Sequence, residues 1–370
     1  MRALKLKKLH HQRQHNKFSR IEKIVTTIPE HLKFDRSITV ADLVSQFNLL
    51  LLAGRSDELV THVSSPQAAV AGSFISLYQD KAVADLPAGK AFVCLTNNII
   101  GASLKRSHPE ATLLVCDNPR RMSAQILTEF FCSHESLDKF VSETAIIDPS
   151  SVIHPDALVG PYAVVGPECH LGPGAVIGAH AVLERNVVIA ENCRISANCW
   201  LANAILGESV KLGPNSVVGK RGFGFDGQGS NSQLIPHLGR VLIGKGCDIG
   251  SGVSIDRGVI DDTCIGSHVM IDNLVHIAHN VCIGDNTIIL GQVGIAGSAT
   301  VEANCIIGGQ AGIADHVYLC EGVIVASKSG VTKNIFKPGT YAGFPAEPAR
   351  GFWAQQAALR RLINKAKKAK

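Results

Sequence analysis

Aliphatic residues recur at every sixth position through much of this chain. One unbroken series comprises Ile271, Ile277, Ile283, Ile289, Ile295, Val301, Ile307, Ile313, Leu319, Val325 and Val331. An earlier series comprises Ile153, Val159, Val165, Leu171, Ile177, Leu183, Ile189, Ile195 and Leu201. A spacing of six fits neither the period of a helix, about 3.6 residues, nor the simple alternation of an ordinary strand. It predicts a β-helix built from hexapeptide repeats.

The same repeat predicts which residues share an edge of the β-helix. If three hexads form one triangular coil, residues 18 apart in the sequence stack about 4.8 Å apart along the axis. His279 then stacks on Gly297, and the following coil places Asp315 and His316 on the same edge. A neutral imidazole can take a proton from an attacking amine or hydroxyl, and a glycine N–H can stabilise the oxyanion of an acyl carbonyl. This edge therefore predicts acyl transfer without a serine or cysteine nucleophile.

The pattern divides the chain into four regions. Residues 1–35 form a basic lead, and residues 36–143 lack the six-residue period and predict a small α/β domain. In that domain we expect helices over Thr39–Asn48 and from Asn118 to Phe131, and strands over Ala91–Leu95 and Thr112–Cys116. Residues 144–335 form the β-helix, with a loop excursion at 219–241 that is rich in Gly, Ser and Asn.

Residues 336–370 predict an exit loop followed by a basic C-terminal helix from Ala349. The helix carries an apolar stripe, formed by Phe352, Leu359, Leu362, Ile363 and Ala366. A terminal helix that cannot bury such a stripe alone suggests self-association.

Composition adds further constraints. Hydrophobic residues make up 46% of the 370 residues, which excludes general disorder, and no apolar run approaches the roughly 18 residues of a membrane span. The N-terminal residues lack the apolar segment of a secretory signal, so we expect a cytoplasmic protein. None of the 11 cysteines forms a CxxC pair, and several stand two residues before an aliphatic anchor: Cys193, Cys199, Cys247 and Cys305. These are expected to be small buried hydrophobes.

The net charge of +5 is concentrated at the two ends of the sequence. Residues 1–20 hold seven Lys and Arg, residues 350–370 hold seven more, and neither stretch contains Asp or Glu. We expect these stretches to meet an acidic partner, and we do not expect nucleic acid.

Several motifs together resemble one enzyme family. They are GKRGFGF (219–225), IPHLGRVLIG (235–244), IDRG (255–258), IDNLVHIAHNVCIGDN (271–286), GQVGIAGSATV (291–301), GGQAGIADH (308–316), SGVTKNI (329–335) and YAGFPA (341–346). The combination looks like bacterial UDP-3-O-(3-hydroxyacyl)glucosamine N-acyltransferase of lipid A (lipopolysaccharide) biosynthesis, over roughly residues 145–346. This resemblance implies a left-handed parallel β-helix in a homotrimer, with active sites between neighbouring subunits.

The resemblance also implies a reaction. An (R)-3-hydroxyacyl chain would pass from the phosphopantetheine of acyl carrier protein to the 2-amino group of UDP-3-O-acyl-glucosamine, without a further cofactor or a metal. His279 in the IAHN match would be the general base, and Gly297 in AGS would be the oxyanion donor.

Four further residues become candidates for substrate binding through the resemblance. Asp272 and Asn273 match a DN pair that would orient the histidine or contact the sugar amine. His316 would contact the substrate phosphate or sugar, and His276 lies near the same edge.

The acyl chain and its carrier have expected places as well. Acyl carrier proteins are acidic, so the basic C-terminal helix would seat the carrier through an interaction that weakens with salt. The resemblance places the acyl groove near Ser329–Val331. Gly330 falls where some relatives carry a bulky side chain, which predicts room for a longer acyl chain.

The first domain departs from the family pattern. Relatives have an Asn-Pro-Lys-Tyr-like stretch after a Ser-Phe pair, and it contributes to the uridine pocket. This chain reads SFISLYQDKAV (73–83) instead. Tyr78 lies close to the place of the absent tyrosine and could stack on uracil, and Lys81 is a second candidate there.

Three other interpretations stay open. A related UDP-N-acetylglucosamine O-acyltransferase shares the hexad helix and an Ile-Ala-His motif, although the α/β domain, Asn280 and the RGFGF loop argue against it. Hexapeptide proteins of carbonic-anhydrase type hold zinc through three histidines, and His276, His279 and His316 could form such a site between subunits. The third is a scaffold without enzymatic activity.

Overall fold

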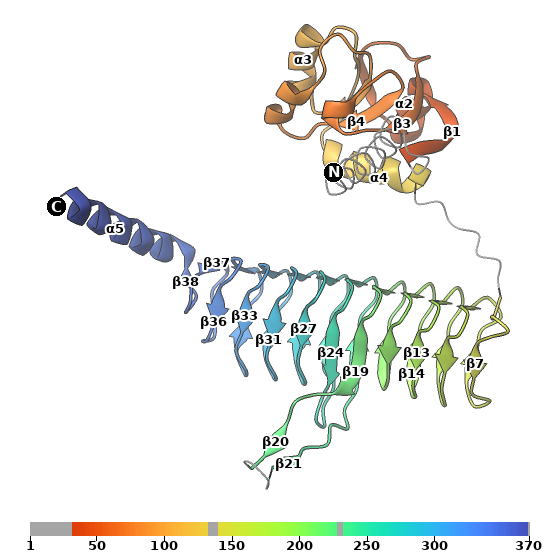
Figure 1. Ribbon diagram of the computed structural model, residues 1–370, viewed down its shortest axis with the longest axis vertical. Helices are drawn as coiled ribbons and strands as arrows, with labels where there is room; N and C mark the ends of the chain where they lie inside the picture. The colour runs from red at the N-terminus through yellow and green to blue at the C-terminus, as the bar shows by residue number, and fades with distance from the viewer. Residues whose placement is uncertain (1–31, 132–139, 228–231, 369–370) are drawn as a thin grey trace, which may run out of the picture. The chain divides into compact units, whose positions relative to one another are not determined.

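The computed structural model describes residues 32–131, 140–227 and 232–368 (Figure 1). The chain divides into two compact units, Met1–Ser136 and Leu137–Lys370, and each has its own hydrophobic core. The region boundary expected at residue 143 thus lies a few residues after the division between the units. Among the described residues, no helix combines the length and the apolar character needed to cross a bilayer.

The first unit is a six-stranded sheet with helices on both faces. In spatial order, its strands are β1 (Lys33–Thr39), β3 (Leu59–Val63), β4 (Ser73–Ser76), β5 (Val93–Thr96), β6 (Thr112–Val115) and β2 (Leu50–Ala53). Its helices are α2 (Val40–Phe47), α3 (Asn98–Ser107) and α4 (Pro119–Phe131), with short 3-10 turns η2 (Pro66–Ala68) and η3 (Asp80–Asp85). Strands β3 to β6 are parallel, whereas β1 and β2 are antiparallel to their neighbours. Alternate side chains of β5 enter opposite cores: Leu95 packs in the cluster that holds Ile126, and Cys94 in the cluster that holds Leu104.

The helices and strands expected in this unit are confirmed. α2 begins after Thr39, whose hydroxyl accepts the Asp42 N–H at 3.1 Å in a capping box, and it ends at Asn48 in the left-handed conformation. The strands β5 and β6 and the helix α4 lie where the sequence places them. β1 begins at Lys33, two residues before the expected end of the basic lead.

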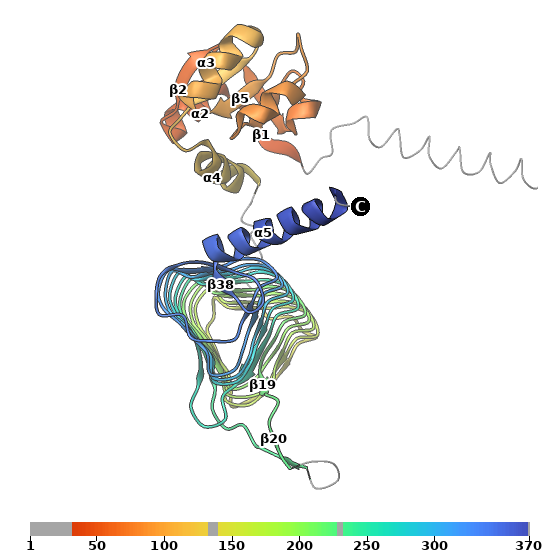
Figure 2. The same ribbon diagram turned by 90° about the vertical axis from the view of Figure 1, so that its left-hand side faces the viewer.

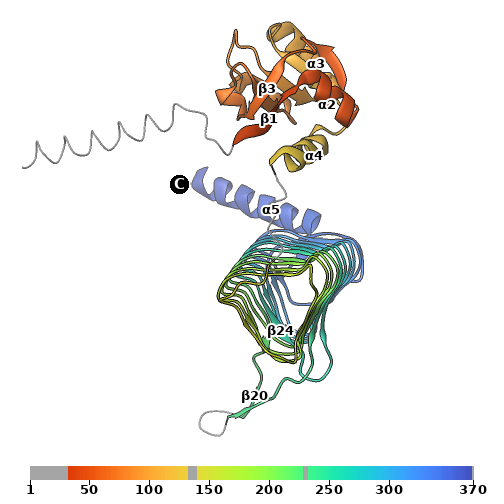
Figure 3. The ribbon, with the colours of Figure 1, turned by 90° about the vertical axis from the view of Figure 1, so that its right-hand side faces the viewer.

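The second unit is a parallel β-helix whose three sheets run along its axis, and its triangular cross-section is visible from both ends (Figures 2 and 3). The first sheet holds β7 (Ile146–Ile147), β10 (Val164–Val165), β13 (Val182–Leu183), β16 (Trp200–Leu201), β19 (Val217–Arg221), β24 (Ser254–Arg257), β27 (His276–Ile277), β30 (Gly294–Ile295), β33 (Gly312–Ile313) and β36 (Gly330–Val331). The second holds β8 (Val152–Ile153), β11 (His170–Leu171), β14 (Val187–Ile189), β17 (Ala204–Leu206), β22 (Val241–Ile243), β25 (Thr263–Ile265), β28 (Cys282–Ile283), β31 (Thr300–Val301) and β34 (Tyr318–Leu319). The third holds β9 (Leu158–Val159), β12 (Val176–Ile177), β15 (Arg194–Ile195), β18 (Lys211–Leu212), β23 (Asp248–Ile249), β26 (Met270–Ile271), β29 (Ile288–Ile289), β32 (Ile306–Ile307), β35 (Val323–Val325), β37 (Gly339–Ala342) and β38 (Glu347–Pro348).

The six-residue period sets the register of these sheets. His276 pairs with Gly294, and Gly294 with Gly312, so residues 18 apart in the sequence are neighbours on one sheet. The aliphatic anchors point inward and form one continuous core; only Ile153, in the first coils, stays partly buried. The expected fold class, a left-handed parallel β-helix with a small α/β domain before it and a helix after it, is confirmed.

The corners of the coils use asparagine more often than glycine. Asn192, Asn198 and Asn304 adopt left-handed φ values of 57°, 60° and 58°, a conformation that short polar side chains tolerate. Glycine after an anchor has a different function. At Gly178, a Cβ would lie 2.6 Å from the Ala197 backbone nitrogen of the next coil, so glycine allows the coils to stack closely.

The cysteines beside the anchors are buried, as expected. None of the four forms a disulfide, and burial raises the pKa of each thiol: Cys193, Cys199, Cys247 and Cys305. They act as small core residues rather than as reactive thiols.

Two loops interrupt the coils. The excursion leaves after β19 and returns at β22, and its tip is the hairpin of β20 (Phe225–Asp226) and β21 (Gln233–Leu234), seen in Figure 2. A second, shorter loop at 258–262, which the period did not single out, separates β24 from β25. The two loops bind one another, because Leu238 N donates to Val259 O at 2.6 Å. The Arg257 guanidinium, at the end of β24, also donates to Leu238 O at 2.7 Å.

The expected C-terminal helix is α5 (Ala349–Lys368), which follows the antiparallel pair β37 and β38. Leu359, Leu362 and Ile363 of its apolar stripe are exposed, and Phe352 is partly buried. The side chain of Ala366 lies outside the described part of the helix. An apolar face thus stays uncovered on this chain.

The inward and outward positions of one strand should differ sharply in their contribution to stability. Ile189→Ala removes a side chain that is 1% exposed and should lower the free energy of unfolding by about 2–5 kcal/mol. Val188→Ala, at the neighbouring outward position, should change it by no more than about 0.5 kcal/mol. Urea unfolding followed by circular dichroism measures both, and equal losses would contradict the inward orientation of the anchors.

Candidate functional site

His279 and Gly297 stack on one edge of the β-helix, as the repeat predicts. A Cβ on Gly297 would lie 2.7 Å from His279 Cε1, so the imidazole ring lies directly over the glycine. The backbone joins the same three coils, because Ser298 N donates to His279 O and His316 N donates to Gly297 O, each at 3.0 Å. A pocket of about 340 Å³ opens here, lined by Phe223, Asp256, His276, Ala278, His279, Gly294, Ile295, Ala296, Gly297 and Ile313.

The N–H of Gly297 is free for a ligand because of its place in the coil. It stands two positions after an anchor, and other coils have proline there, which has no N–H: Pro161, Pro167, Pro173 and Pro214. No hydrogen bond between described residues uses the Gly297 N–H. The fold therefore leaves this amide unpaired beside the imidazole.

Asn280 determines which nitrogen of His279 carries the proton. Asn280 Oδ1 lies 3.1 Å from His279 Nδ1 and accepts the Val259 N–H at 2.9 Å, whereas Asn280 Nδ2 donates to Asp261 O at 3.0 Å. These backbone partners, both in the 258–262 loop, fix the amide with its oxygen towards the imidazole. His279 Nδ1 must then donate, so Nε2 of the neutral ring holds the free lone pair that a general base needs.

A second histidine, His237, packs against His279 from the excursion. Their ring centroids are 5.1 Å apart with an interplanar angle of 81°. His237 Nδ1 lies 3.0 Å from Ile235 O, which can only accept, so Nε2 is the unprotonated nitrogen. Within the described residues, Nε2 is buried without a hydrogen-bond partner. Burial lowers the pKa of His237 below its usual value, and the adjacent His279 lowers this pKa further.

The glycines of the GKRGFGF motif allow the excursion to approach these two rings. A Cβ on Gly222 would lie 2.9 Å from His237 Nε2 and 3.1 Å from His279 Cβ, and one on Gly224 would lie 3.1 Å from His237 Cε1. Phe223, between them, is 80% exposed and lines the pocket. The alternation of Gly and Phe thus places the glycines against the histidines and an aromatic ring at the entrance.

A buried carboxylate lies on another wall of the pocket. Asp256 is 1% exposed and forms an ion pair with Lys220, its partner in the β19–β24 register. Asp256 Oδ2 also lies 3.8 Å from His276 Nε2. Asp256 and His276 line the pocket, and Lys220 pairs with the carboxylate, so this wall suits a polar substrate group such as an amine.

The other substrate-binding candidates on the β-helix lie away from this pocket. Asp272 accepts the Asn273 N–H at 2.7 Å and the Gly291 N–H at 3.0 Å, and Asn273 Oδ1 accepts the Ser251 N–H at 2.8 Å. Both side chains thus hold corners of neighbouring coils, and Asn280 occupies the place beside His279 that was expected for them. His316 is exposed on the expected edge but does not line the pocket.

The space beside Gly330 is occupied rather than open. A Cβ on Gly330 would overlap the ring of Phe344, which comes from the exit segment between β37 and β38. Gly330 was expected to leave room for a longer acyl chain, but the ring of Phe344 occupies the space beside it. The preference for a longer chain stays a prediction.

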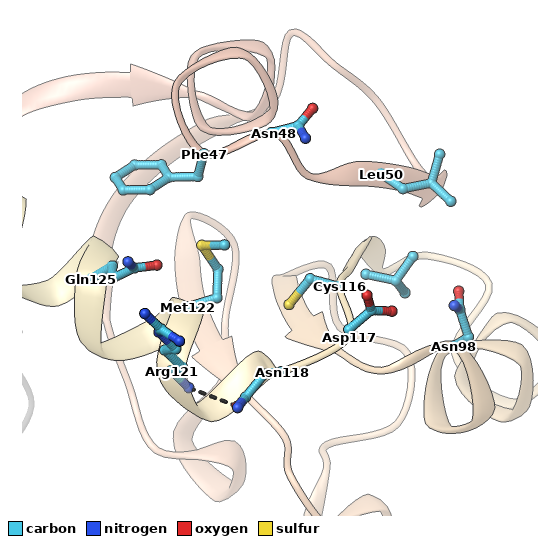
Figure 4. Close-up of a pocket in the computed structure, with 11 residues that line it drawn as sticks. Phe47, Asn48, Leu50, Asn98, Cys116, Asp117, Asn118, Arg121, Met122 and Gln125 are labelled. Atoms are coloured by element: carbon cyan, nitrogen blue, oxygen red, sulfur yellow. Dashed lines mark hydrogen bonds between the residues drawn. The ribbon is translucent and has the colours of Figure 1, made fainter.

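The first unit has a pocket of its own, but Tyr78 and Lys81 do not line it. Both residues are exposed, after β4 and in η3 respectively. The pocket, of about 490 Å³, lies at the carboxyl end of β6 and is lined by Phe47, Asn48, Leu50, Asn98, Val115, Cys116, Asp117, Asn118, Arg121, Met122 and Gln125 (Figure 4). Phe47 and Met122 face one another across it. Open parallel sheets usually bind ligands outside the carboxyl ends of their strands, and this pocket lies at such an end. The predicted strand over Thr112–Cys116 could have pointed to this place.

No group of three or more His, Cys, Asp and Glu side chains in the described ranges is arranged to hold a metal ion.

Comparison with known proteins gives partial matches. The family model described as "GMPPB C-terminal domain" matches residues 141–223. The UDP-3-O-acylglucosamine N-acyltransferase of Hydrogenovibrio crunogenus is 48% identical over 79 residues, which are 21% of this chain and 23% of that protein. The chain resembles the UDP-3-O-acylglucosamine N-acyltransferases. The match spans about a quarter of that relative's length.

Solved structures with a matching arrangement include two UDP-N-acetylglucosamine acyltransferases. That of Arabidopsis is 24% identical with a TM-score of 0.47, and the alignment covers 56% of this chain and 73% of that one. That of Francisella novicida is 19% identical with a TM-score of 0.45, covering 56% and 69%.

His237 should make folding sensitive to mild acid. The fold lowers its pKa, so as the pH falls below about 6.5 the unfolded chain takes up the proton first and the folded state loses stability. His237→Gln should therefore show a smaller fall in unfolding temperature between about pH 7.5 and pH 5.5 than the parent. Exposed His180→Gln is the matched control and should follow the parent. An identical fall in the parent and in His237→Gln would contradict this account.

Proposed function

We propose that this chain is a UDP-3-O-(3-hydroxyacyl)glucosamine N-acyltransferase. It transfers an (R)-3-hydroxyacyl chain from acyl carrier protein to the 2-amino group of the sugar. The observation that carries the proposal is the imidazole of His279 directly over Gly297, whose N–H has no partner among the described residues, with Asn280 directing Nε2 as the base. The resemblance to N-acyltransferases supports the choice of an amine as the acceptor.

Each atom of the reaction has a place in this arrangement. The amine nitrogen attacks the thioester carbonyl while His279 Nε2 takes its proton, and the Gly297 N–H stabilises the oxyanion of the tetrahedral intermediate. When the intermediate collapses, the C–S bond breaks and the imidazolium returns the proton to the departing thiolate. The products are the amide and the free phosphopantetheine thiol, and no acyl-enzyme is formed.

Further groups would hold the substrate during this step. Asp256 and His276 lie on the pocket wall and would contact the polar sugar nucleotide, and Lys220 pairs with the Asp256 carboxylate. His316 stays a candidate for phosphate or sugar contact at the exposed edge, and Asp272 and Asn273 stay candidates for contact with the sugar amine.

The C-terminal helix supports the proposed partners. α5 exposes its apolar stripe and carries Arg350, Arg360 and Arg361, which suit a homotrimer contact and an acidic acyl carrier protein respectively. The uridine would lie in the first unit. Tyr78 and Lys81 stay candidates for contact with it, and the separate pocket at Arg121 is a further candidate.

Removal of His279 should abolish turnover. With acyl carrier protein and UDP-3-O-acylglucosamine, the parent should yield an amide that survives mild alkali, whereas an O-acyltransferase would yield a labile ester. His279→Ala should lower kcat/KM at least about 100-fold because the general base is lost. His268→Ala, an exposed histidine of the same β-helix, is the control. Mass spectrometry of the product measures the rates of the parent and of both variants. A His279→Ala rate above one hundredth of the parent's rate would contradict the base role.

Asn280 should act through the tautomer of His279. Asn280→Ala should lower kcat about 10- to 100-fold with little change in KM, whereas Asn280→Asp keeps an acceptor for Nδ1 and should retain more of the activity. The control for a left-handed corner residue is Asn286→Ala, which has a φ of 56° and lies away from the pocket. Equal losses in Asn280→Asp and Asn280→Ala, or a comparable loss in Asn286→Ala, would argue against a tautomer effect.

A further inference from the structure

Phe344 is held over Gly330 by the backbone on both sides of it. Gly330 N donates to Gly343 O at 3.0 Å, and Ala346 N donates to Gly330 O at 2.8 Å. Gly343 N also donates at 3.1 Å to the hydroxyl of Ser329, which is only 3% exposed. The ring between these contacts covers the Cα of Gly330, while 79% of Phe344 stays exposed.

Gly330 belongs to a column that begins at the candidate active site. The register pairs His276 with Gly294, Gly294 with Gly312, and Gly312 with Gly330, all on the outward face of the first sheet. A Cβ on Gly294 or Gly312 would meet nothing within 4 Å, so the surface beside these two coils is open. At Gly330 the column meets the ring of Phe344.

The active-site pocket already extends along this column. Its lining passes from His279 over Gly294 and Gly297 to Ile313, which lies on the strand of Gly312. Two coil steps of about 4.8 Å separate Gly294, in the coil of Gly297, from Gly330, a distance of about 10 Å. With C–C bonds of about 1.5 Å in a zigzag, this accommodates on the order of eight carbons of an extended chain.

We propose that Phe344 sets the length of the acyl chain that the enzyme accepts. The inference rests on the proposed acyl transfer and adds its specificity-determining residue. The acyl chain leaves the thioester carbonyl at Gly297, lies over Gly294 and Gly312, and ends against the exposed face of the Phe344 ring. Gly330 contributes by making room for that ring, because any larger residue there would displace it.

Competition between chain lengths tests the inference directly. The parent and Phe344→Ala are offered acyl carrier protein loaded with a mixture of 3-hydroxyacyl chains of about 6 to 16 carbons, a range that brackets the column length. Mass spectrometry then gives the ratios of kcat/KM. Phe344→Ala should shift the preferred length upward, with a gain of roughly tenfold or more in the ratio of the longer to the parental chain. Phe336→Ala removes another exposed phenylalanine of the exit segment and should leave the preference unchanged.

Two further variants keep the result interpretable. Phe344→Leu retains an apolar side chain of smaller reach and should give an intermediate shift, which covers the case in which Phe344→Ala does not fold. In the double variant Phe344→Ala/Gly330→Met, the methionine occupies the space that the ring leaves and should return the preference towards the shorter chain.

The possible results distinguish a failure of the role of Phe344 from a failure of the proposed acyltransferase function. Active variants at Phe344 with the parental chain preference would overturn the role of Phe344 and leave the acyltransferase proposal intact. A parent that transfers none of the chains to the amine would overturn both.

Discussion

Parallel pairing of the backbone between successive coils is the constraint on which this structure depends. Where no loop intervenes, most of the short strands hydrogen-bond to the strands 17 or 18 residues before and after them, and the inward aliphatic side chains can form a core only in that register. A slip of one residue would turn every anchor outward. Residues that are far apart in sequence are therefore fixed as neighbours with little freedom, and a site built on such an edge is rigid before any ligand arrives.

The chemistry occupies places that the ladder leaves unused. The corner amide of Gly297 has no partner in the coil, and prolines at equivalent corners indicate that the fold does not need one. The two loops then complete the site: the 258–262 loop orients Asn280, and the excursion brings His237 and Phe223 to the same corner. The regular part of the fold supplies precision, and its interruptions supply the groups that are particular to this chain.

The sequence predicts the β-helix, the stacking of His279 on Gly297 and the burial of the cysteines, because all three follow from a period that tertiary packing enforces. It does not predict His237 as a neighbour of His279, since an insertion has no register, although the residue stands in the quoted IPHLGR motif. Asp272 and Asn273 were expected to orient the histidine or to contact the sugar amine; within this chain their side chains bond to corner amides, and the contact with the sugar amine stays a prediction. Phe344 over Gly330 depends on how the exit segment returns to the last coil, which no local pattern encodes.

The outward glycines Gly294, Gly312 and Gly330 follow one another at intervals of one coil, so the length of the column is set by the number of coils. Inserting or deleting one coil of 18 residues between Gly312 and Gly330 would move the terminal ring by about 4.8 Å and leave the catalytic edge untouched. Substitutions at the ring itself change the available length in smaller steps. In a β-helix, the selectivity for chain length can thus change in large steps through the gain or loss of a coil, and in small steps through substitution of one side chain. Neither change alters the groups that perform the reaction.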